Sequence, residues 1–473
     1  WSYFLLNAGE RVVFRRLAIF QGGCTLEAAT VVCSSAELGE GDVVAAIERL
    51  TAKSLLVRDS AGGTDRYSML ATTAEYAKQQ IVSLDELSEW ERRHGVYFEA
   101  LARRLATSFG SMPTTQWQRE VTTERFNLRF ALQRLFALEE VARAAHMLDG
   151  LRDWCWERGA LYLADMRERI EGASMHTGHT ESVRASLWLT MAAVLRRTDP
   201  AKACEYAERA FELRRRDANL VVRADALRAV VATQMSARGK IAPEFEAILH
   251  ATIDDSLVDA STVRAAELLN GLGILLAQGM DDARIEEALG CFERATGLLR
   301  ARGDGDRCAR LLGNSAAIYS GLGRVDDAVE YSRRSIELYE SSEEPWMAVR
   351  QSMNHGLYLM ERGAHGDYDE ARVALRSALE AAREFNDIVA TLAGLDYFAQ
   401  LAHRVGRHRE AIRLAGFAAK EHAGAARQAR YAAMHEELLA ALRRTAGDLV
   451  YRSEWKNGQN MTIEEAVYVA QAL

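Results

Sequence analysis

Few residues of this chain have the types and the spacing that catalysis or metal binding requires. His176 and His179 share the polar segment GASMHTGHT, but no third ligand stands nearby, and two ligands make a poor metal site. No phosphate loop of the form GxxxxGK(S/T), no HExxH motif and no GxSxG motif occurs in the sequence. The sequence therefore predicts no catalytic residue, no metal site and no cofactor site in this chain.

Other clusters that might suggest chemistry are expected to be structural. The carboxylates within residues 281–287 are expected at a solvated helix start, where the helix dipole favours negative charge. The glycines within 271–273 and 321–323 are spaced too closely for a phosphate loop and are expected to serve turns and helix packing. The six cysteines are scattered and form no CxxC motif, which predicts free, buried thiols in a reducing cytoplasm.

The composition is that of a folded and mostly helical protein. Hydrophobic residues make up 49% and charged residues 27% of the 473 residues, and only four prolines are present to interrupt helices. The net charge of −8 disfavours nucleic-acid binding by the chain as a whole, because phosphates require a basic face. No apolar run approaches the roughly 20 residues that span a bilayer. We therefore expect a cytoplasmic protein without membrane contact.

Residues 1–83 have the pattern of a small winged-helix domain. Helices are expected at residues 10–20, 25–34, about 41–56 and 72–82. Thr25 is a suitable N-cap for the second of these helices. Two short runs, 55–58 and 66–70, flank Gly62-Gly63 and predict a β-hairpin between the third and fourth helices.

Residues 84–140 are expected to form a helical connector. Its first helix is long and amphipathic, and its predicted apolar side consists of Leu84, Leu87, Trp90, Val96, Tyr97, Leu101 and Leu105. Pro113 marks a break before the next helix.

Residues 141–425 are expected to form six or seven helix pairs of tetratricopeptide type. The clearest repeat lies at 311–340, where small residues allow two helices to cross closely. Equivalent alanines recur at intervals of 39 to 44 residues, namely Ala164, Ala203, Ala247, Ala288, Ala328, Ala371 and Ala411. Residues 426–473 are expected to cap the array. The predicted fold is thus an all-α, right-handed superhelical solenoid behind a small winged-helix domain with a β-hairpin.

The head resembles a known family. The runs LAIFQGGCTLEAATVVCS, VVAAIERLTAKSLLVRD and RYSMLATTAEYAKQQI look like the winged-helix arm of STAND-type signalling ATPases, which in bacteria is common in large transcriptional regulators. The resemblance continues into the connector through Glu124, Asn127, Leu128, Ala131 and Leu132. One departure is Ala71, which stands where the family usually has an acidic residue. A contact made by that carboxylate in the family is therefore not expected here.

The resemblance implies a nucleotide-binding domain before the winged helix. ATP or ADP would bind in that domain, which this chain does not contain. Because the sequence begins at Trp1 rather than Met, we expect it to be a piece of a longer protein. Its final stretch, WKNGQNMTIEEAVYVA, also resembles the end of the family's chains, so we expect the natural C-terminus.

A winged helix can also bind DNA by inserting its third helix into the major groove. Here that helix offers only Arg49 and Lys53, with Arg58 and Arg66 near the wing. Carboxylates nearby offset these charges. We therefore interpret the head as an arm that packs on an ATPase core, or as a cap of the solenoid, rather than as a DNA reader.

The candidate binding surface is the face formed by the first helix of each pair. Mapping from the small residues gives six candidates for contact with a partner: Asn270, Arg310, Asn314, Arg350, Asn354 and Asp396. Arg and Asn side chains can hold a carboxylate or a peptide backbone by paired hydrogen bonds. The alternative is that these residues are only solvated. Trp154, Trp156 and Trp188 could likewise line the groove, although core packing is the simpler interpretation.

Two functions from different classes remain open, with a third behind them. The first is a scaffold that senses a protein, a peptide or a small molecule in the solenoid groove and relays binding through the winged helix to an ATPase domain. The second is a stand-alone adaptor for protein assembly. The third is an enzyme whose site has no recognisable motif.

Overall fold

The structure is a computed structural model of the whole chain. It describes all residues except 1, 61–64, 85, 110, 113, 197, 259–261, 279–280, 341–347, 385–387 and 422–428. The predicted turn at Gly62-Gly63, the break at Pro113 and the repeat boundary near residue 425 lie outside the described residues. The chain divides into two compact units, Trp1–Ala237 (unit 1) and Arg238–Leu473 (unit 2).

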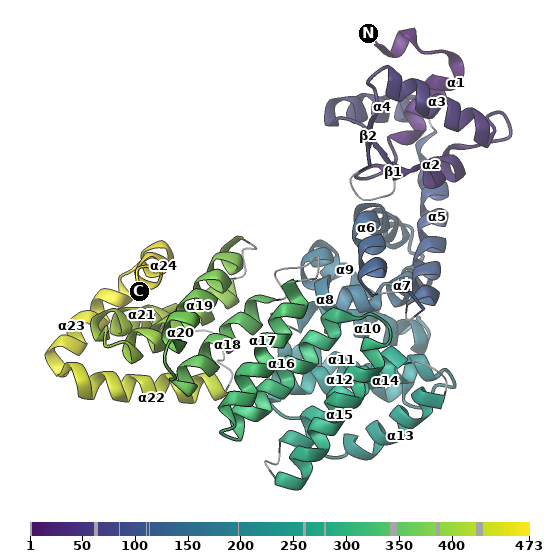
Figure 1. Cartoon of the computed structure of the whole chain (residues 1–473). Coiled ribbons are helices and arrows are strands. Elements are labelled where there is room, and N and C mark those ends of the chain that lie inside the picture. Colours follow the sequence, from purple (N-terminus) through teal and green to yellow (C-terminus); the bar gives the residue numbers. More distant parts are fainter. Residues whose placement is uncertain are drawn as a thin grey trace. The chain divides into compact units, whose positions relative to one another are not determined.

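The first part of unit 1 is the predicted winged helix. Its elements are η1 (Ser2–Leu5), α1 (Ala8–Leu17), β1 (Cys24–Thr25), α2 (Leu26–Cys33), α3 (Glu40–Ala52), β2 (Val57–Asp59), β3 (Arg66–Ser68) and α4 (Ala71–Ser83) (Figure 1). The hairpin strands β2 and β3 pair antiparallel, as expected. The sequence did not predict β1, which also pairs with β3, so that the strand order is β1-β3-β2.

Two glycines allow β1 to reach the sheet. Gly22 and Gly23 have φ angles of 72° and 85°, which favour glycine. A Cβ atom on Gly23 would lie 2.7 Å from the carbonyl oxygen of Tyr67, so no side chain fits between the strands. Thr25 then caps α2 by accepting a hydrogen bond from the backbone N–H of Ala28 at 3.1 Å, as predicted.

The remainder of unit 1 is helical. Its elements are α5 (Leu87–Ser108), α6 (Thr114–Ala137), α7 (Val141–Gly150), α8 (Arg152–Tyr162), η2 (Ala164–Met166), α9 (Arg167–Met175), α10 (Glu181–Leu195), α11 (Pro200–Arg214) and α12 (Leu220–Arg238). Helices α5, α6 and α7 pack against one another below the head, and α10 packs against α7, α8, α9 and α11 (Figure 1).

The predicted apolar side of α5 needs a correction. Trp90 and Leu105 are buried as expected, but Val96 is about half exposed, at 48%. Leu84 is 52% exposed because it lies at the C-cap of α4, before α5 begins. The buried face of α5 also includes His94 and Phe98, and the apolar pattern left out His94 because histidine is polar.

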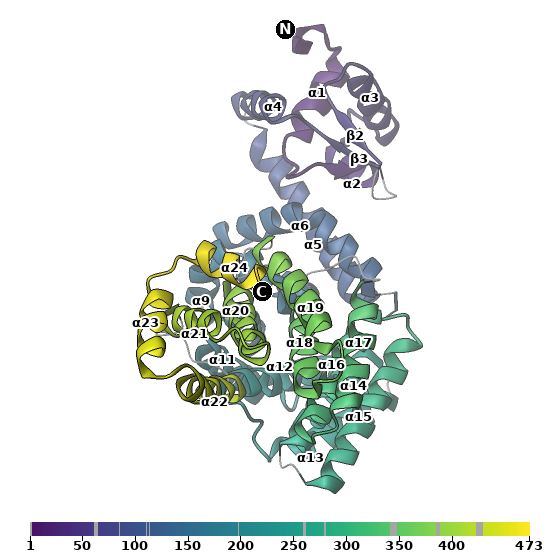
Figure 2. The ribbon, with the colours of Figure 1, turned by 60° about the vertical axis from the view of Figure 1, so that its left-hand side comes forward.

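Unit 2 consists of paired helices. They are α13 (Phe245–Val258), α14 (Thr262–Ala277), α15 (Asp282–Arg300), α16 (Gly305–Gly321), α17 (Val325–Glu340), α18 (Ala348–Arg362), α19 (Asp367–Glu384), α20 (Ile388–Arg404), α21 (His408–Glu421), α22 (Ala429–Ala446), α23 (Asp448–Gln459) and α24 (Ile463–Gln471). Successive pairs such as α14/α15, α16/α17 and α18/α19 stack side by side (Figure 2).

Most of the predicted alanine anchors are at close helix crossings. Five of them, Ala203, Ala288, Ala328, Ala371 and Ala411, are completely buried. Two anchors were wrong. Ala164 is exposed because it lies in the short 3-10 turn η2, and Ala247 is exposed because α13 buries Phe245 and Leu249 instead.

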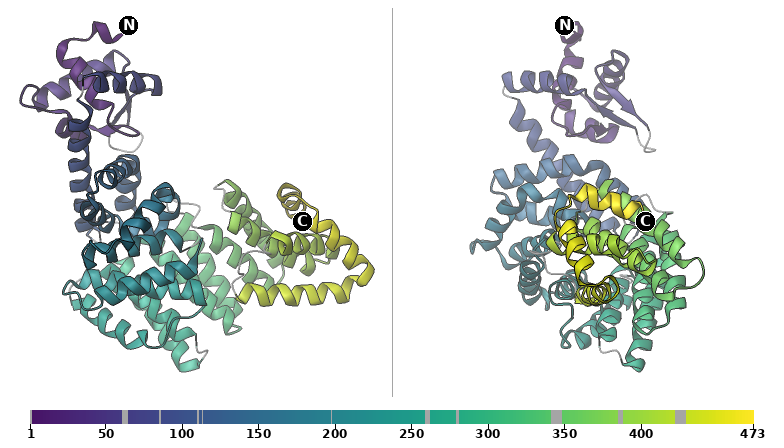
Figure 3. Two further views of the ribbon diagram at one scale, coloured as in Figure 1. Left: turned by 180° about the vertical axis from the view of Figure 1, so that it is seen from behind. Right: turned by 90° about the vertical axis from the view of Figure 1, so that its left-hand side faces the viewer.

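Helices at the C-terminal end of unit 2 cross closely. Helix α21 packs against α23, and α24 contacts both α20 and α21 (Figure 3, yellow segments). A Cβ atom on Gly458 would lie 2.2 Å from the carbonyl oxygen of Arg413, so this crossing requires glycine. Among the helices that the structure describes, none is long and apolar enough to cross a membrane.

Candidate binding surfaces

The four basic residues on the third helix and near the wing, Arg49, Lys53, Arg58 and Arg66, are each paired with a carboxylate of the same chain. Arg49 Nε and Lys53 Nζ lie 3.1 and 2.6 Å from the two carboxylate oxygens of Glu10, which is buried in α1. The hydrogen bond from Lys53 lowers the pKa of Glu10 despite its burial. The cations that would face DNA therefore already compensate an internal charge.

The two cations near the wing are also engaged. Arg58 pairs with Asp65 within the hairpin, and Arg66 pairs with Glu124 of α6. Arg66 also donates a hydrogen bond to the carbonyl oxygen of Gly23 at 3.1 Å. Because Glu124 belongs to the connector, this pair fastens the sheet of the head to the helices that follow.

Asn127 of α6 is the centre of the junction between head and connector. Its Oδ1 accepts hydrogen bonds from the backbone N–H of Gln21 at 2.7 Å and from His94 Nε2 at 3.2 Å. Its Nδ2 donates to the carbonyl oxygen of Gly23 at 2.9 Å and to Glu124 at 2.8 Å. The sequence resemblance singled out Asn127, and the structure assigns it this structural role. Burial lowers the pKa of His94 to about 4, although the hydrogen bond with Asn127 opposes this shift.

In unit 2, most of the predicted contact residues lie on neighbouring first helices and pair across them. Asn314 Nδ2 of α16 donates to Asn270 Oδ1 of α14 at 2.6 Å. The hydroxyl of Tyr397 on α20 donates to Asn354 Oδ1 of α18 at 3.5 Å. We call this row of contacts the cross-repeat ladder; its members are Glu267, Asn270, Arg310, Asn314, Asn354, Asp396, Tyr397 and His435.

The ladder also contains an ion pair and a contact between a carboxylate and a histidine. Arg310 pairs with Glu267 of α14, and Asp396 lies 3.3 Å from His435 Nδ1 of α22. The side chains of Arg310 and Asp396 are 21% and 22% exposed, so both remain open to water. Arg350 stands apart, since it is exposed and has no ion-pair partner among the described residues. The sequence did not identify Glu267, Tyr397 and His435. No sequence pattern shows which side chains on the first helices of neighbouring repeats come into contact.

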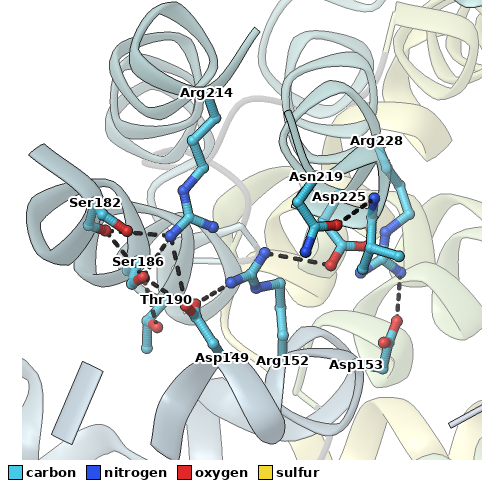
Figure 4. A network of polar contacts seen from close by, with 11 residues as sticks. Asp149, Arg152, Asp153, Ser182, Ser186, Thr190, Arg214, Asn219, Asp225 and Arg228 are labelled. Atoms are coloured by element: carbon cyan, nitrogen blue, oxygen red, sulfur yellow. Dashed lines mark hydrogen bonds and ion pairs between the residues drawn. The ribbon is translucent and has the colours of Figure 1, made fainter. Parts of the chain in front are cut away.

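Unit 1 contains a second set of polar contacts, which sequence reasoning missed. Arg152 of α8 pairs with Asp149 of α7 and with Asp225 of α12, the latter at 3.3 Å. Arg228 of α12 pairs with Asp153 at 3.0 Å. We call this the ion network; its members are Asp149, Arg152, Asp153, Arg214, Asp225 and Arg228, with Ser182 and Ser186 (Figure 4).

Arg214 closes the ion network from α11. Its Nη2 donates to Ser186 Oγ and to the carbonyl oxygen of Ser182, and it lies 3.4 Å from Asp149. Its Nε and Nη1 are buried and have no hydrogen-bond partner among the described residues. Burial, followed by the charge of Arg152, lowers the pKa of Arg214. These atoms are buried and the contacts join α7, α8, α10, α11 and α12, so we interpret the ion network as structural.

One group in unit 2 has the residue types of a catalytic triad. Ser332 Oγ lies 2.7 Å from His355 Nδ1, and His355 Nε2 lies 3.3 Å from Glu370. Ser332 is completely buried, however, and its hydroxyl also donates to the carbonyl oxygen of Val329. A nucleophile must be accessible to its substrate. This arrangement therefore joins α17, α18 and α19 and offers no reactive oxygen.

The remaining candidates behave as structural residues. His176 accepts a hydrogen bond from the backbone N–H of Gly178, and no cluster of three metal-ligating side chains occurs in the described part of the chain. Asp281 caps α15, as predicted for its acidic start. The three tryptophans Trp154, Trp156 and Trp188 are buried, which confirms core packing. All six cysteines are buried and free.

Comparison with known proteins agrees with this architecture. A model of the winged helix-turn-helix domain matches residues 6–82, and a tetratricopeptide repeat model matches residues 309–342. Two curated relatives named as HTH-type transcriptional regulators, from Mycobacterium bovis and Mycobacterium tuberculosis, are each 37% identical over 107 residues. That stretch is 23% of this chain and only 12% of the relatives' length.

A solved structure has a similar fold. It is a Signal Transduction ATPase with Numerous Domains (STAND) protein with a tetratricopeptide repeat sensor from Pyrococcus horikoshii, with a TM-score of 0.51 and 12% identity. The match covers 97% of this chain and 63% of that protein. These findings confirm the resemblance found in the sequence. The chain joins a winged helix-turn-helix domain to tetratricopeptide repeats.

Proposed function

We propose that this chain is the sensor and scaffold portion of a bacterial STAND-type transcriptional regulator that acts in the cytoplasm. Its repeats bind a protein, peptide or small-molecule effector, and its winged helix passes the event to an ATPase domain outside this chain. ATP or ADP would bind in that other domain, and no residue of this chain is assigned to the nucleotide. In this proposal residues 1–83 are the arm, 84–140 the connector, 141–425 the repeats and 426–473 the cap.

The cross-repeat ladder is the observation that carries the proposal. Asn270, Asn314 and Asn354 are only partly buried. Their side-chain amides can therefore replace a hydrogen bond to a neighbouring side chain by one to a peptide backbone at little cost in free energy. Arg350 on α18 is exposed and has no ion-pair partner in the described part of the chain, so it would attract an acidic group of the partner.

The ion pairs formed by basic residues of the head favour a role of the winged helix in relaying a signal over a role in binding DNA. Arg49, Lys53, Arg58 and Arg66 each have a carboxylate partner within the chain, so binding phosphates would break existing ion pairs. Asn127 and the pair between Arg66 and Glu124 couple the head to the connector. A displacement of α6 would therefore move the head with it.

Affinity capture from the source cells tests the binding part of the proposal. The double variant Asn314→Ala/Asn354→Ala should retain about tenfold less of the specific partner than the wild type, because two hydrogen-bonding amides are lost. The matched control is Glu293→Ala/Glu337→Ala, which removes two exposed side chains from the second helices α15 and α17. Equal capture by both double variants would refute the assigned face.

A DNA-binding assay tests the role of the head. With fluorescent duplex DNA at physiological salt, the chain should show no tight binding. Sequence-specific binding that is lost in Lys53→Ala would instead identify the head as a DNA reader. The stand-alone adaptor remains the alternative: it shares the capture result, and it would be favoured if the complete gene encoded no phosphate loop before this segment.

A further inference from the structure

A cavity of about 390 Å³ opens in unit 1, whereas the cross-repeat ladder belongs to unit 2. Its walls come from α6 and from the segment formed by η2 and α9. The volume lies within the range of about 300–1,000 Å³ that is usual for small-molecule sites. The cavity can therefore hold a small molecule but not a folded domain.

The charged residues that line this cavity differ in their pairing. Asp165 forms an ion pair with Arg129 at 2.7 Å and accepts a hydrogen bond from the Gln133 side chain at 3.0 Å. Arg134 pairs with Glu91 at 2.6 Å. Arg169 also lines the cavity, yet it has no ion pair or hydrogen bond among the described residues. Of the charged residues that line the cavity, Asp165 and Arg134 already have ion-pair partners, and Arg169 is the one without a partner among the described residues.

An apolar surface completes the site. Phe130 is only partly buried and supplies an aromatic ring on the cavity wall. Arg134 also lines the cavity, but its guanidinium pairs with Glu91 and its Nε has no exposed surface, so Arg169 is the cation that a ligand can reach.

We propose that this cavity binds a small organic anion. Its carboxylate or phosphate group accepts hydrogen bonds from Arg169, and its apolar part packs on Phe130. A charged guanidinium binds both anionic groups by the same hydrogen-bond chemistry, so the site is defined by the charge and the apolar body of its ligand.

The position of the cavity gives such a ligand a route to the head. The ring of Phe130 packs edge-on against His94, with 5.3 Å between ring centroids. His94 in turn hydrogen-bonds Asn127, the centre of the junction with the head. A ligand that shifts Phe130 would therefore act on the junction directly. This site is distinct from the ladder, and its test does not depend on the proposed function.

Saturation-transfer NMR on the full chain tests the proposal with three probes of similar shape. Benzoate and phenyl phosphate should bind, and the uncharged benzyl alcohol should bind about tenfold more weakly because it cannot form charge-assisted hydrogen bonds. The variant Arg169→Gln should lower the affinity for benzoate about tenfold. Arg167→Gln, which removes an exposed arginine from the same helix outside the cavity, should leave it unchanged.

The outcomes separate clearly. Binding of both anions supports the shared chemistry, and binding of only one of them identifies the source as a carboxylate or a phosphate. Equal binding of benzyl alcohol, unchanged affinity in Arg169→Gln, or no binding of either anion at millimolar concentration would overturn the proposal. Arg169 is exposed, so its variant should fold normally, which circular dichroism verifies.

Discussion

In the ion network of unit 1 the charged side chains other than Asp149 are at most 10% exposed, whereas the cross-repeat ladder of unit 2 combines buried residues with side chains that are partly open to water. The side chains of Arg152, Arg214 and Asp225 are only 4–7% exposed. Those of Arg310 and Asp396 are 21% and 22% exposed. A buried charge must keep its partner, because losing it leaves an uncompensated ion. A partly exposed side chain can instead give up its partner within the chain and bind a ligand.

The comparison assigns different tasks to similar residue types. The ion network fixes how α7, α8, α10, α11 and α12 pack, since each of its members has partners on another helix (Figure 4). The ladder contributes less to packing and leaves donors and acceptors within reach of a partner. Substitutions in the two regions should therefore separate stability from binding.

The largest effect is expected in the ion network. Asp225→Asn should lower the free energy of unfolding of unit 1 by about 3 kcal/mol, because it leaves buried Arg152 with only Asp149. Urea denaturation followed by tryptophan fluorescence measures this, since Trp154, Trp156 and Trp188 lie in unit 1. A loss below about 1 kcal/mol, the value for an exposed pair, would show that the network is not structurally important.

Lowering the pH should reveal how much His94, which is buried in unit 1, contributes to the stability of the fold. His94 has a pKa of about 4 when folded and about 6.5 when unfolded, so its contribution is complete above pH 6.5 and is lost as the pH falls towards 4. The total loss should be about 3 kcal/mol. Thermal unfolding at several pH values should show a shallower decline in His94→Phe, which cannot titrate. An identical decline in both proteins would contradict the lowered pKa.

A smaller effect is expected from the buried hydroxyl of unit 2. Ser332→Ala should cost about 1 kcal/mol, because His355 loses a hydrogen-bond partner. Denaturation of the variant measures this cost. The wild type should hydrolyse nitrophenyl acetate no faster than the variant does, since Ser332 is inaccessible. Hydrolysis that depends on Ser332 would refute the structural interpretation.

The smallest change in stability is expected in the ladder. Asn314→Ala should lower the free energy of unfolding by only about 0.5 kcal/mol. The hydrogen bond that it removes joins two side chains, Asn314 and Asn270, that are only partly buried. The same substitution should nevertheless weaken partner capture. If Asn314→Ala destabilised the chain as strongly as Asp225→Asn, the distinction between the two regions would fail.

Parts of this account follow from the sequence alone. Helix pairs were predictable because small residues such as Ala288 and Ala328 recur where helices cross, and their burial confirms it. The anchors at Ala164 and Ala247 failed because local turns and helix rotation override a regular interval. The strand β1 was missed because two residues carry too little pattern.

The polar contacts were less predictable. The contact between Asn270 and Asn314 joins two residues chosen from their repeat positions, but Glu267, Tyr397 and His435 were not foreseen. The ion network joins residues up to 76 positions apart (Asp149 and Asp225), and Arg and Asp on helices usually indicate a solvated face. Such pairs depend on the rotation between successive helices, which no local pattern encodes.

Hydrogen exchange of the chain alone and with its captured partner would test the central claim most directly. The proposal predicts that the partner slows amide exchange in α14, α16, α18 and α20 and leaves α8, α10 and α12 unchanged. Slowed exchange around the ion network, with no change along the ladder, would contradict it.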